Sequence, residues 1–288
     1  MVPDTTDGLW AKAVRPRWNV KFKTNLYIVK TAETGSEIEQ ALRLRHEVFR
    51  RELLGAPLPS GLDIDRFDPQ CDHMIVQAGD TGQVVATYRL NPSETGDYYA
   101  RQEFEMSAVL HLAGRKLEIG RACVARGYRS GAVFTLLWRG MAAYLRQAEI
   151  RYMFGCSCVP ARISHELAPL YQYFQARHLS PDHLRVHPLS SGAVPAVQLK
   201  LAVGRSAGDA VKRLIPPILQ VYLRSGGWIC GEPYCDSEFN SYDFFTLLDV
   251  AAASPAARRF LAGPRPAAVE ERREVCKYGP NRSSSSSV

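Results

Sequence analysis

Several common signatures of function are missing from this sequence. It has no Walker loop, no G-x-G-x-x-G loop, no G-x-S-x-G elbow and no H-E-x-x-H motif, which disfavours nucleotide, hydrolase and zinc-protease chemistry. Cys156 and Cys158 could be combined with His183 and His187 as zinc ligands. However, the single residue between the two cysteines is shorter than the usual spacing in zinc sites. We therefore expect no metal site.

Long apolar runs are also missing. No window approaches the roughly 18 to 20 apolar residues that a membrane-spanning helix needs, and the most apolar stretch, 132–145, is interrupted by Arg139. The N-terminal residues lack the order of a signal peptide. The seven cysteines are odd in number and irregularly spaced, which favours reduced thiols. The sequence thus predicts a cytoplasmic protein.

The charge balance, in contrast, is distinctive. Among 288 residues, 36 are Lys or Arg and 29 are Asp or Glu, so the formal net charge is +7. A basic excess favours an acidic partner or an anionic surface. Composition alone leaves nucleic acid, anionic lipid and an acidic carrier protein open.

The two ends of the chain differ in composition from the middle. Residues 1–25 mix basic and aromatic side chains without a regular period and predict an extended N-terminal arm. Residues 262–288 are first proline-rich, then charged, and contain five consecutive serines, a composition that predicts a disordered tail. We expect one folded domain over residues 26–261.

Within that domain, hydrophobic periodicity alternates between strands and helices. Helices are expected from a cap at Ser36 to about residue 54, at 131–149, at 161–178, and from 216 to the glycine pair 226–227. Strands are expected at 26–29, 73–78, 84–90, 116–124, 152–156, 197–203 and 244–250, with a hairpin turn at 79–82. This order predicts an α+β fold with a central sheet covered by helices.

One strand-to-helix connection carries a possible anion site. Glycines at 127–131 precede the helix at 131–149, beside Arg126 and Arg129, and free N–H groups at a helix start bind phosphate. Glu118 lies on the preceding strand, so a base is expected near an anchored substrate, as group transfer requires. Glu118 and Arg121 share a face only if a bulge at Gly120 shifts the strand register.

Four motifs occur in an order that resembles a known family. They are Arg45-His46-Glu47-Val48-Phe49, Asp65-Arg66-Phe67-Asp68, Tyr88-Arg89-Leu90 and Glu118-Ile119-Gly120-Arg121. The order resembles the acyltransferases of the GNAT fold that use acyl carrier protein, which include acyl-homoserine lactone synthases and the ornithine N-acyltransferases of ornithine-lipid synthesis. Further matches at 71–73, 98–104, 131–140, 154–156, 216–224 and 239–241 are closer to the ornithine branch.

The resemblance implies a GNAT-like fold and a specific reaction. A fatty acyl group, typically 3-hydroxyacyl, moves from the phosphopantetheine thioester of acyl carrier protein to the α-amino group of ornithine, giving lyso-ornithine lipid. Acyl carrier protein and ornithine are the implied partners, with no bound cofactor and no nucleic acid. The chain departs from the general GNAT loop R/Q-x-x-G-x-G/A at 129–134, which disfavours coenzyme A and leaves carrier-linked phosphopantetheine.

The reaction needs a base, because the α-amine is mostly protonated at neutral pH. We expect Glu118 in this role, with Asp72 in reserve. Backbone N–H groups around Cys123 and Val124 are expected to polarise the thioester carbonyl. The alternative for Glu118 is a surface carboxylate paired with a neighbouring arginine.

Substrate-binding and carrier-binding residues follow from the same resemblance. Substrate binding is expected from Arg45, Phe49, Asp65, Asp68, Arg89, Arg121, Cys123 and Val124. A partly buried Arg45 would need an anionic partner, such as Asp65, Asp68 or a substrate carboxylate. Carrier and phosphopantetheine binding is expected from Arg126, Arg129, Ser130, Gly131, Ala132 and Arg139, although these residues could also form an ordinary solvated basic face.

Four rival functions stay open. They are carrier-dependent acylation of another amino acid, acyl-homoserine lactone synthesis, coenzyme A-dependent N-acetylation, and a non-catalytic module that binds carrier protein or membrane. An amphiphilic product is also compatible with peripheral contact at the inner face of the membrane.

Overall fold

The computed structural model describes residues 15–200 and 211–262. Of the expected N-terminal arm, residues 1–14 lie outside this description, as does all of the expected tail except residue 262. Among the described residues, no helix has the length and apolar character needed to cross a membrane.

A mixed sheet forms the centre of the described part of the chain, with nine strands in the path β1-β2-β3-β4-β6-β7-β11-β10 and β9 beside β11. Only β6 and β7 pair in parallel; every other pairing among the described strands is antiparallel. The strands are β1 (Lys21–Lys23), β2 (Tyr27–Thr31), β3 (Asp72–Ala78), β4 (Val84–Asn91), β6 (Arg115–Val124), β7 (Ile150–Pro160), β9 (Trp228–Ile229), β10 (Tyr234–Asp236) and β11 (Ser241–Asp249). A small second sheet joins β5 (Phe104–Glu105) to β8 (His187–Pro188). The predicted α+β class is confirmed.

The helices largely follow the sequence pattern. They are α1 (Gly35–Arg45), which continues as a π-helix (His46–Leu53), α2 (Ser107–Leu110), α3 (Ala132–Gln147), α4 (Leu167–Arg177), α5 (Ala196–Lys200), α7 (Pro217–Arg224) and α8 (Pro255–Ala262). The predicted cap at Ser36 is wrong, because the capping box is formed by Thr34 and Glu37. The strand predicted at 197–203 is also wrong over its described part, which belongs to α5.

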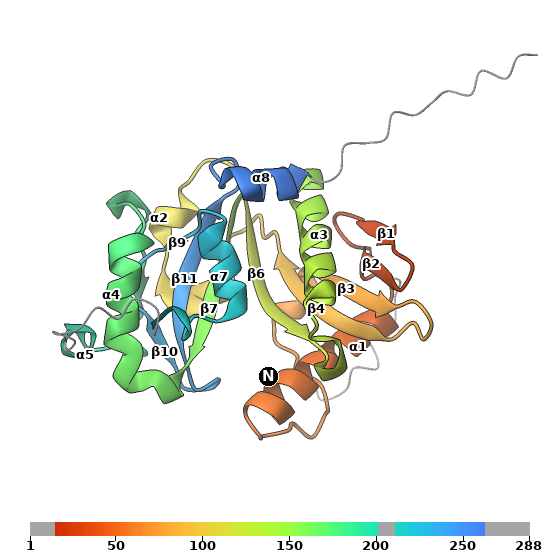
Figure 1. The fold of residues 1–288 in the computed structure, drawn as a ribbon, viewed down its shortest axis with the longest axis horizontal. Helices are drawn as coiled ribbons and strands as arrows, with labels where there is room; N and C mark the ends of the chain where they lie inside the picture. Colours follow the sequence, from red (N-terminus) through yellow and green to blue (C-terminus); the bar gives the residue numbers. More distant parts are fainter. Residues whose placement is uncertain (1–14, 201–210, 263–288) are drawn as a thin grey trace, which may run out of the picture.

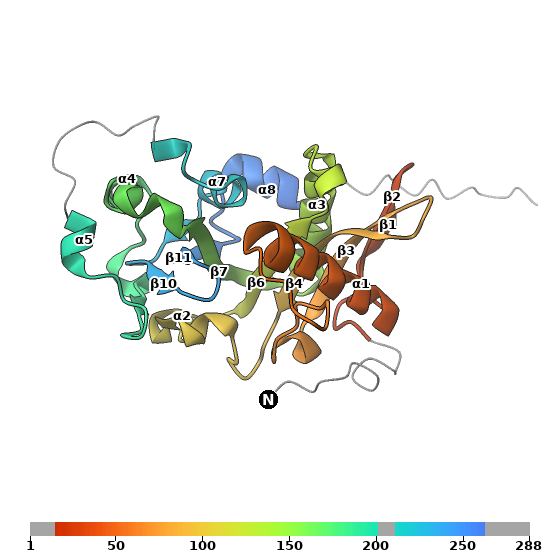
Figure 2. The ribbon, with the colours of Figure 1, turned by 90° about the horizontal axis from the view of Figure 1, so that it is seen from below.

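Helices cover both faces of the sheet (Figures 1 and 2). Alternation along β3 shows why: Ile75 joins the buried cluster that contains α1, whereas Met74 joins the cluster that contains α3. At Gly140 of α3, an added Cβ would lie 2.7 Å from the sulfur of Met74. The glycine therefore lets α3 approach the sheet closely.

The sheet splits between β6 and β7. Their parallel pairing runs only from Arg115 with Ile150 to Glu118 with Phe154. Beyond that point β6 remains paired with β4 and β7 with β11, so the two strands diverge and divide the sheet into two halves (Figure 1). At Gly155, an added Cβ would lie 2.3 Å from the carbonyl oxygen of Ile119, so the strands touch closely just where they begin to separate.

β6 contains a bulge, at residues 121–122 and not at Gly120, which pairs regularly with Arg89. Thr87 pairs with Cys123 but Arg89 pairs with Gly120, so β6 has one more residue than β4 between these pairs. Arg121 has a φ of 54°, the left-handed conformation typical of bulged backbone. The extra residue brings Glu118 and Arg121 to the same pocket.

The described end of the expected arm is part of the sheet. Lys21–Lys23 form the edge strand β1 against β2. The ring of Trp18 packs edge-on against Tyr144 of α3, with centroids 5.5 Å apart, and the backbone N–H of Arg17 donates to the Asp72 carboxylate. The division of the chain at residue 25 stays a prediction.

Candidate active site

A pocket of about 420 Å³ occupies the gap between β6 and β7. Its walls come from the π-helix, β4, β6, β7, α7, β10 and β11, and they are mainly apolar. The polar or charged residues on the wall include Arg89, Tyr99, Glu118, Arg121, Cys156, Ser157, Asp236 and Asp243. Of the expected substrate-binding residues, Phe49, Arg89 and Arg121 line this pocket.

Glu118 lines the pocket but is only 5% exposed. Its carboxylate accepts hydrogen bonds from the backbone N–H groups of Tyr99 at 2.8 Å and Ala100 at 2.7 Å, and from the Asn91 side chain at 3.3 Å. Burial raises the pKa of Glu118, although these donors and Arg89 oppose the rise. A carboxylate held in place with a raised pKa is suited to accept a proton near neutral pH.

Four arginines and three aspartates form a largely buried network beside the pocket, in which Arg50 contacts Asp63 at 3.0 Å. Arg45 contacts Asp63 at 3.0 Å and Asp68 at 2.6 Å. Asp65 receives Arg89 at 2.5 Å and Arg121 at 3.2 Å. The expectation that Arg45 needs a buried anion is confirmed, with Asp68 as a partner.

The arginines determine the charge state of this network. Burial alone would raise the pKa values of Asp63, Asp65 and Asp68, but the neighbouring guanidinium groups outweigh it and hold all three below their ordinary values. The network is therefore fully ionised at neutral pH and internally compensated. Arg45 belongs to the network but does not line the pocket, whereas Arg89 and Arg121 do.

Two further groups on the wall were not identified from the sequence. The hydroxyl groups of Tyr88 and Tyr222 are hydrogen-bonded to each other, and burial raises the pKa of both phenols. Tyr88 begins the Tyr88-Arg89-Leu90 motif, but nothing in the sequence predicts that Tyr222 of α7 lies beside it. Both hydroxyls line the site and stay protonated; because one donates to the other, the pair keeps one O–H group for a further acceptor.

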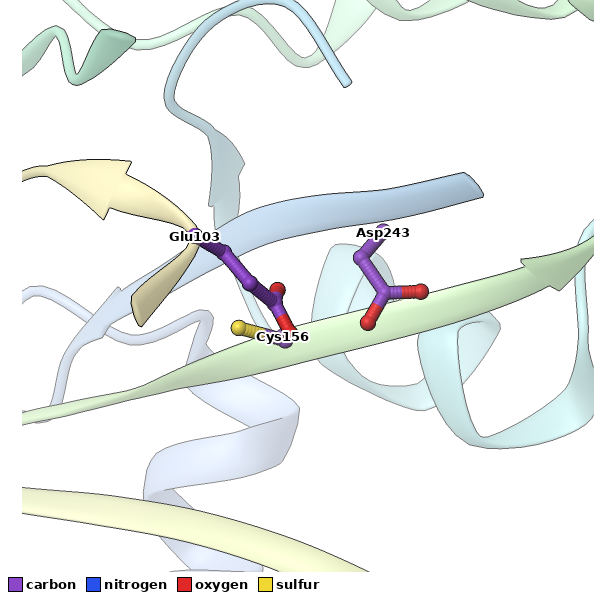
Figure 3. A group of neighbouring side chains, drawn as sticks. All are labelled: Glu103, Cys156 and Asp243. Atoms are coloured by element: carbon purple, nitrogen blue, oxygen red, sulfur yellow. The ribbon is translucent and has the colours of Figure 1, made fainter. Parts of the chain in front are cut away.

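One cluster has the residue types of a cation site. Potential ligand atoms of Glu103, Cys156 and Asp243 all lie within 4.8 Å of one another (Figure 3). No local sequence pattern indicates this cluster, because the three residues come from separate segments of the chain.

The comparisons with known proteins agree with this geometry. Residues 44–139 match the model of an acetyltransferase (GNAT) domain. The L-ornithine N(alpha)-acyltransferase of Rhodobacter capsulatus is 32% identical over 247 residues, which cover 81% of this chain and 94% of the relative. The chain belongs to the L-ornithine N(alpha)-acyltransferase family. A second family member, from Rhizobium meliloti, is 30% identical over 88% of this chain and 90% of its own length.

Two solved structures show more distant similarity to this family member. An N-acyl amino acid synthase from uncultured soil microbes has a TM-score of 0.47 at 10% identity and covers 83% of this chain and 99% of that chain. A CoA-dependent acyl-homoserine lactone synthase has a TM-score of 0.42 at 16% identity, covering 78% and 80%. The family resemblance and the GNAT-like fold inferred from the motifs are confirmed by the family model and the curated relatives.

Several expected site residues of this ornithine acyltransferase homologue lie away from the pocket wall. The Asp72 carboxylate accepts the Tyr144 hydroxyl at 2.8 Å and the Arg17 N–H at 3.1 Å, contacts that fasten the edge of the sheet. Cys123 and Val124 belong to the part of β6 that pairs with β4. Burial raises the pKa of the Cys123 thiol to about 12, so it is a core thiol.

The residues expected to bind the carrier protein form an exposed patch. Arg126, Arg129, Ser130, Gly131, Ala132 and Arg139 are all exposed, at the end of β6 and along α3. Arg129 pairs with Glu52 at 2.7 Å, and the Arg139 guanidinium lies 5.2 Å from the ring centre of Phe22. Gly131 takes the N-cap position of α3 with a φ of 89°. Their role stays a prediction.

Proposed function

We propose that this acyltransferase moves a 3-hydroxyacyl group from the phosphopantetheine thioester of acyl carrier protein to the α-amino group of L-ornithine, giving lyso-ornithine lipid. The observation that carries the proposal is the pocket between β6 and β7, with Glu118 on its wall, in a chain whose relatives are L-ornithine N(alpha)-acyltransferases. The mainly apolar walls suit the acyl chain and the pantetheine arm. The rival amino acids and lactone formation become outcomes of the assay below.

The proposed chemistry uses one proton transfer before and two after the C–N bond forms. Glu118 takes a proton from the ornithine α-ammonium, directly or through water, and the free amine attacks the thioester carbonyl carbon. The tetrahedral intermediate collapses, the C–S bond breaks, the thiolate leaves on the carrier's phosphopantetheine, and the amide nitrogen releases its second proton to water. The Tyr88 and Tyr222 hydroxyl pair on the same wall offers a proton to that thiolate.

The carrier protein would dock on the exposed patch at the end of β6. Carrier proteins are acidic, and Arg126, Arg129 and Arg139 provide exposed positive charge there. The net charge of +7 supports the same partner. The amphiphilic product supports peripheral contact with the inner face of the membrane, in a cytoplasmic enzyme.

The test is a mass-spectrometric assay of purified protein with 3-hydroxyacyl carrier protein and a panel of amino acids. We expect N-acyl-ornithine from the wild type and a loss of about 10²- to 10⁴-fold in Glu118→Gln. Asp72→Asn is the matched control, because it neutralises another buried carboxylate away from the pocket, and it should keep most of the activity.

Each alternative has its own result. Equal activity of Glu118→Gln and the wild type would refute the assignment of the base. If the preferred product is an acylated form of another amino acid, or a lactone, the enzyme catalyses one of the rival acyl transfers. An absence of product with every amine would favour a binding module. In Glu118→Gln the new amide group would face a backbone N–H that donates to the carboxylate in the wild type, which costs stability. Urea unfolding measures this cost, and a variant that stays folded under the assay conditions shows that the lost activity is chemical.

A further inference from the structure

A second group of acids lies at one end of the same pocket. Glu103 precedes β5, Asp236 ends β10, and Asp243 lies on β11; we call these three residues the acidic corner. They are 3%, 7% and 2% exposed, respectively. Asp236 and Asp243 line the pocket, and Glu103 points toward Asp243 beside Cys156 (Figure 3).

The acidic corner has no cationic partner within the described part of the chain. No Lys, Arg or His nitrogen there lies within 4.0 Å of its carboxylates. Asp243 accepts the Ser241 hydroxyl at 2.7 Å and the Cys158 thiol at 3.4 Å. Neither oxygen of Glu103 has a hydrogen bond of ordinary geometry, although the Cys156 thiol and the Tyr99 hydroxyl are near enough to favour the charged form of Glu103. Buried carboxylates without a partner are costly.

The pKa values of Glu103 and Asp243 reflect the missing cationic partner. Burial and the neighbouring Asp243 raise the pKa of Glu103 to about 8. Burial and Asp236 raise the pKa of Asp243 to about 6, although Ser241, Cys158 and Arg121 oppose the rise. The charged form of the corner is therefore disfavoured in the folded protein, and a cation from outside would stabilise it.

We propose that the acidic corner binds the side-chain ammonium of the amino acid acceptor and so selects a diamino acid over a neutral amino acid of the same length. The inference rests on the proposed function. An ammonium group is compact and has three donors, which suits two carboxylates that converge on one point. Asp236 and Asp243 of the corner line the same pocket as Glu118, so one acceptor molecule can place its side-chain ammonium at the corner and its α-amine at the base.

A divalent metal ion is the competing occupant. It would bind Glu103, Cys156 and Asp243, whose potential ligand atoms lie within 4.8 Å of one another. Burial and the neighbouring carboxylates raise the pKa of the Cys156 thiol well above its ordinary value, and metal ligation requires the thiolate. The chemistry of the corner therefore favours the ammonium group.

The test compares L-ornithine with L-norvaline, which has the same carbon chain without the δ-amino group. The wild type should prefer ornithine in kcat/KM by on the order of 100-fold or more. Asp243→Asn and Glu103→Gln should lower this preference at least about tenfold, by losing activity on ornithine while keeping it on norvaline. Glu105→Gln is the control, because Glu105 is exposed on the neighbouring strand β5 and should behave as the wild type.

Thermal unfolding separates this proposal from the proposed function, because it needs no acyl donor. Ornithine, but not norvaline, should raise the melting temperature of the wild type, and Asp243→Asn should abolish that difference. Both variants remove a buried carboxyl group that has no cationic partner among the described residues, so at pH 8 they should unfold at or above the wild-type temperature, which also shows that they fold.

Two results would overturn the acidic corner as an ammonium site. One is an ornithine-to-norvaline ratio unchanged in both variants. The other is a wild-type preference that disappears with EDTA and returns with Zn²⁺ or Mg²⁺. If the wild type forms no N-acyl product but is still stabilised by ornithine alone, the proposed function fails and the ammonium site stands.

Discussion

Replacing Arg45 with methionine would expose the energetic role of the buried network. Arg45 is 1% exposed and joins α1 to Asp63 and Asp68 in the segment before β3. Methionine fills much of the space of the arginine stem and removes only the charge and its donors. The two aspartates would remain buried, with Arg50 still 3.0 Å from Asp63 and Arg89 still 3.5 Å from Asp68.

Removing one partner of a buried ion pair typically costs about 3–5 kcal/mol. Because Arg50 and Arg89 continue to compensate the two aspartates, we expect a loss of about 3 kcal/mol at pH 7. This is a large share of the roughly 5–15 kcal/mol that stabilise a typical domain. Arg43→Met is the control, since Arg43 and Glu39 form an exposed pair that should contribute less than about 1 kcal/mol.

The loss should depend on pH with a defined sign. In the wild type, burial raises the pKa values of Asp63 and Asp68, but Arg45 and its neighbours hold them below the ordinary value. Their stabilising contribution is therefore present above the unfolded pKa of about 3.9 and fades as pH falls through the folded values. In Arg45→Met burial counts for more, the carboxyl groups protonate at higher pH, and the penalty shrinks toward pH 4.

Urea unfolding at pH 7 and at pH 4.5 measures both effects, with equal m-values as the condition for comparing midpoints. A loss below about 1 kcal/mol at pH 7 would show that Arg45 is not needed to compensate the aspartates. A loss of the same size at both pH values would show that the cost comes from packing and not from charge.

Three further predictions test the site from other directions. Gly155→Ala should lower the free energy of unfolding by about 3 kcal/mol or more, since its Cβ would lie 2.3 Å from the Ile119 carbonyl oxygen. Gly127→Ala is the control and should be nearly neutral, because its Cβ has open space around it. Equal effects would contradict the close contact where β6 and β7 begin to separate. The raised pKa of Glu118 predicts that kcat/KM rises with pH through that pKa, and a flat profile between pH 5 and 8 would contradict a base at this position. Arg126→Glu should raise KM for the acyl carrier thioester several-fold at low salt and much less at high salt, and an unchanged KM would place the carrier elsewhere.

The sequence predicts the parts of this fold that local patterning determines. The hairpin of β3 and β4 follows from two β-rich segments and a glycine-containing turn at 79–82, and α3 follows from apolar residues at helical spacing. Two local errors have local causes. Thr34 and Ser36 both begin plausible capping boxes, with Glu37 and Glu39; the box forms with Glu37, which also pairs with Lys30 of β2 at 2.8 Å. Val197 favours a strand by propensity, but its segment packs as a short helix.

The site depends on contacts that no local pattern contains. A bulge is visible only when the register of β6 is compared with that of β4, so the sequence around Gly120 cannot show whether β6 contains one. Asp72 follows Cys71 in a segment that resembles the family motifs, yet its carboxylate turns to Tyr144, 72 residues away. Glu103 and Asp243 are 140 positions apart; Glu103 precedes β5 of the small second sheet and Asp243 lies on β11 of the large sheet, so only the tertiary fold brings them together.

The two acid clusters of this pocket show why charge balance, and not residue type, indicates where a ligand binds. Asp63, Asp65 and Asp68 are each paired with at least one arginine, and their pKa values fall below the ordinary range. The acidic corner has the same functional groups at similar burial, but the described arginines leave it uncompensated, and the pKa values of Glu103 and Asp243 rise. The first arrangement is complete without a ligand and serves stability. The charged form of the acidic corner becomes favourable only when a cation binds. The free-energy cost of burying these carboxylates is therefore the source of the proposed selectivity for an ammonium group.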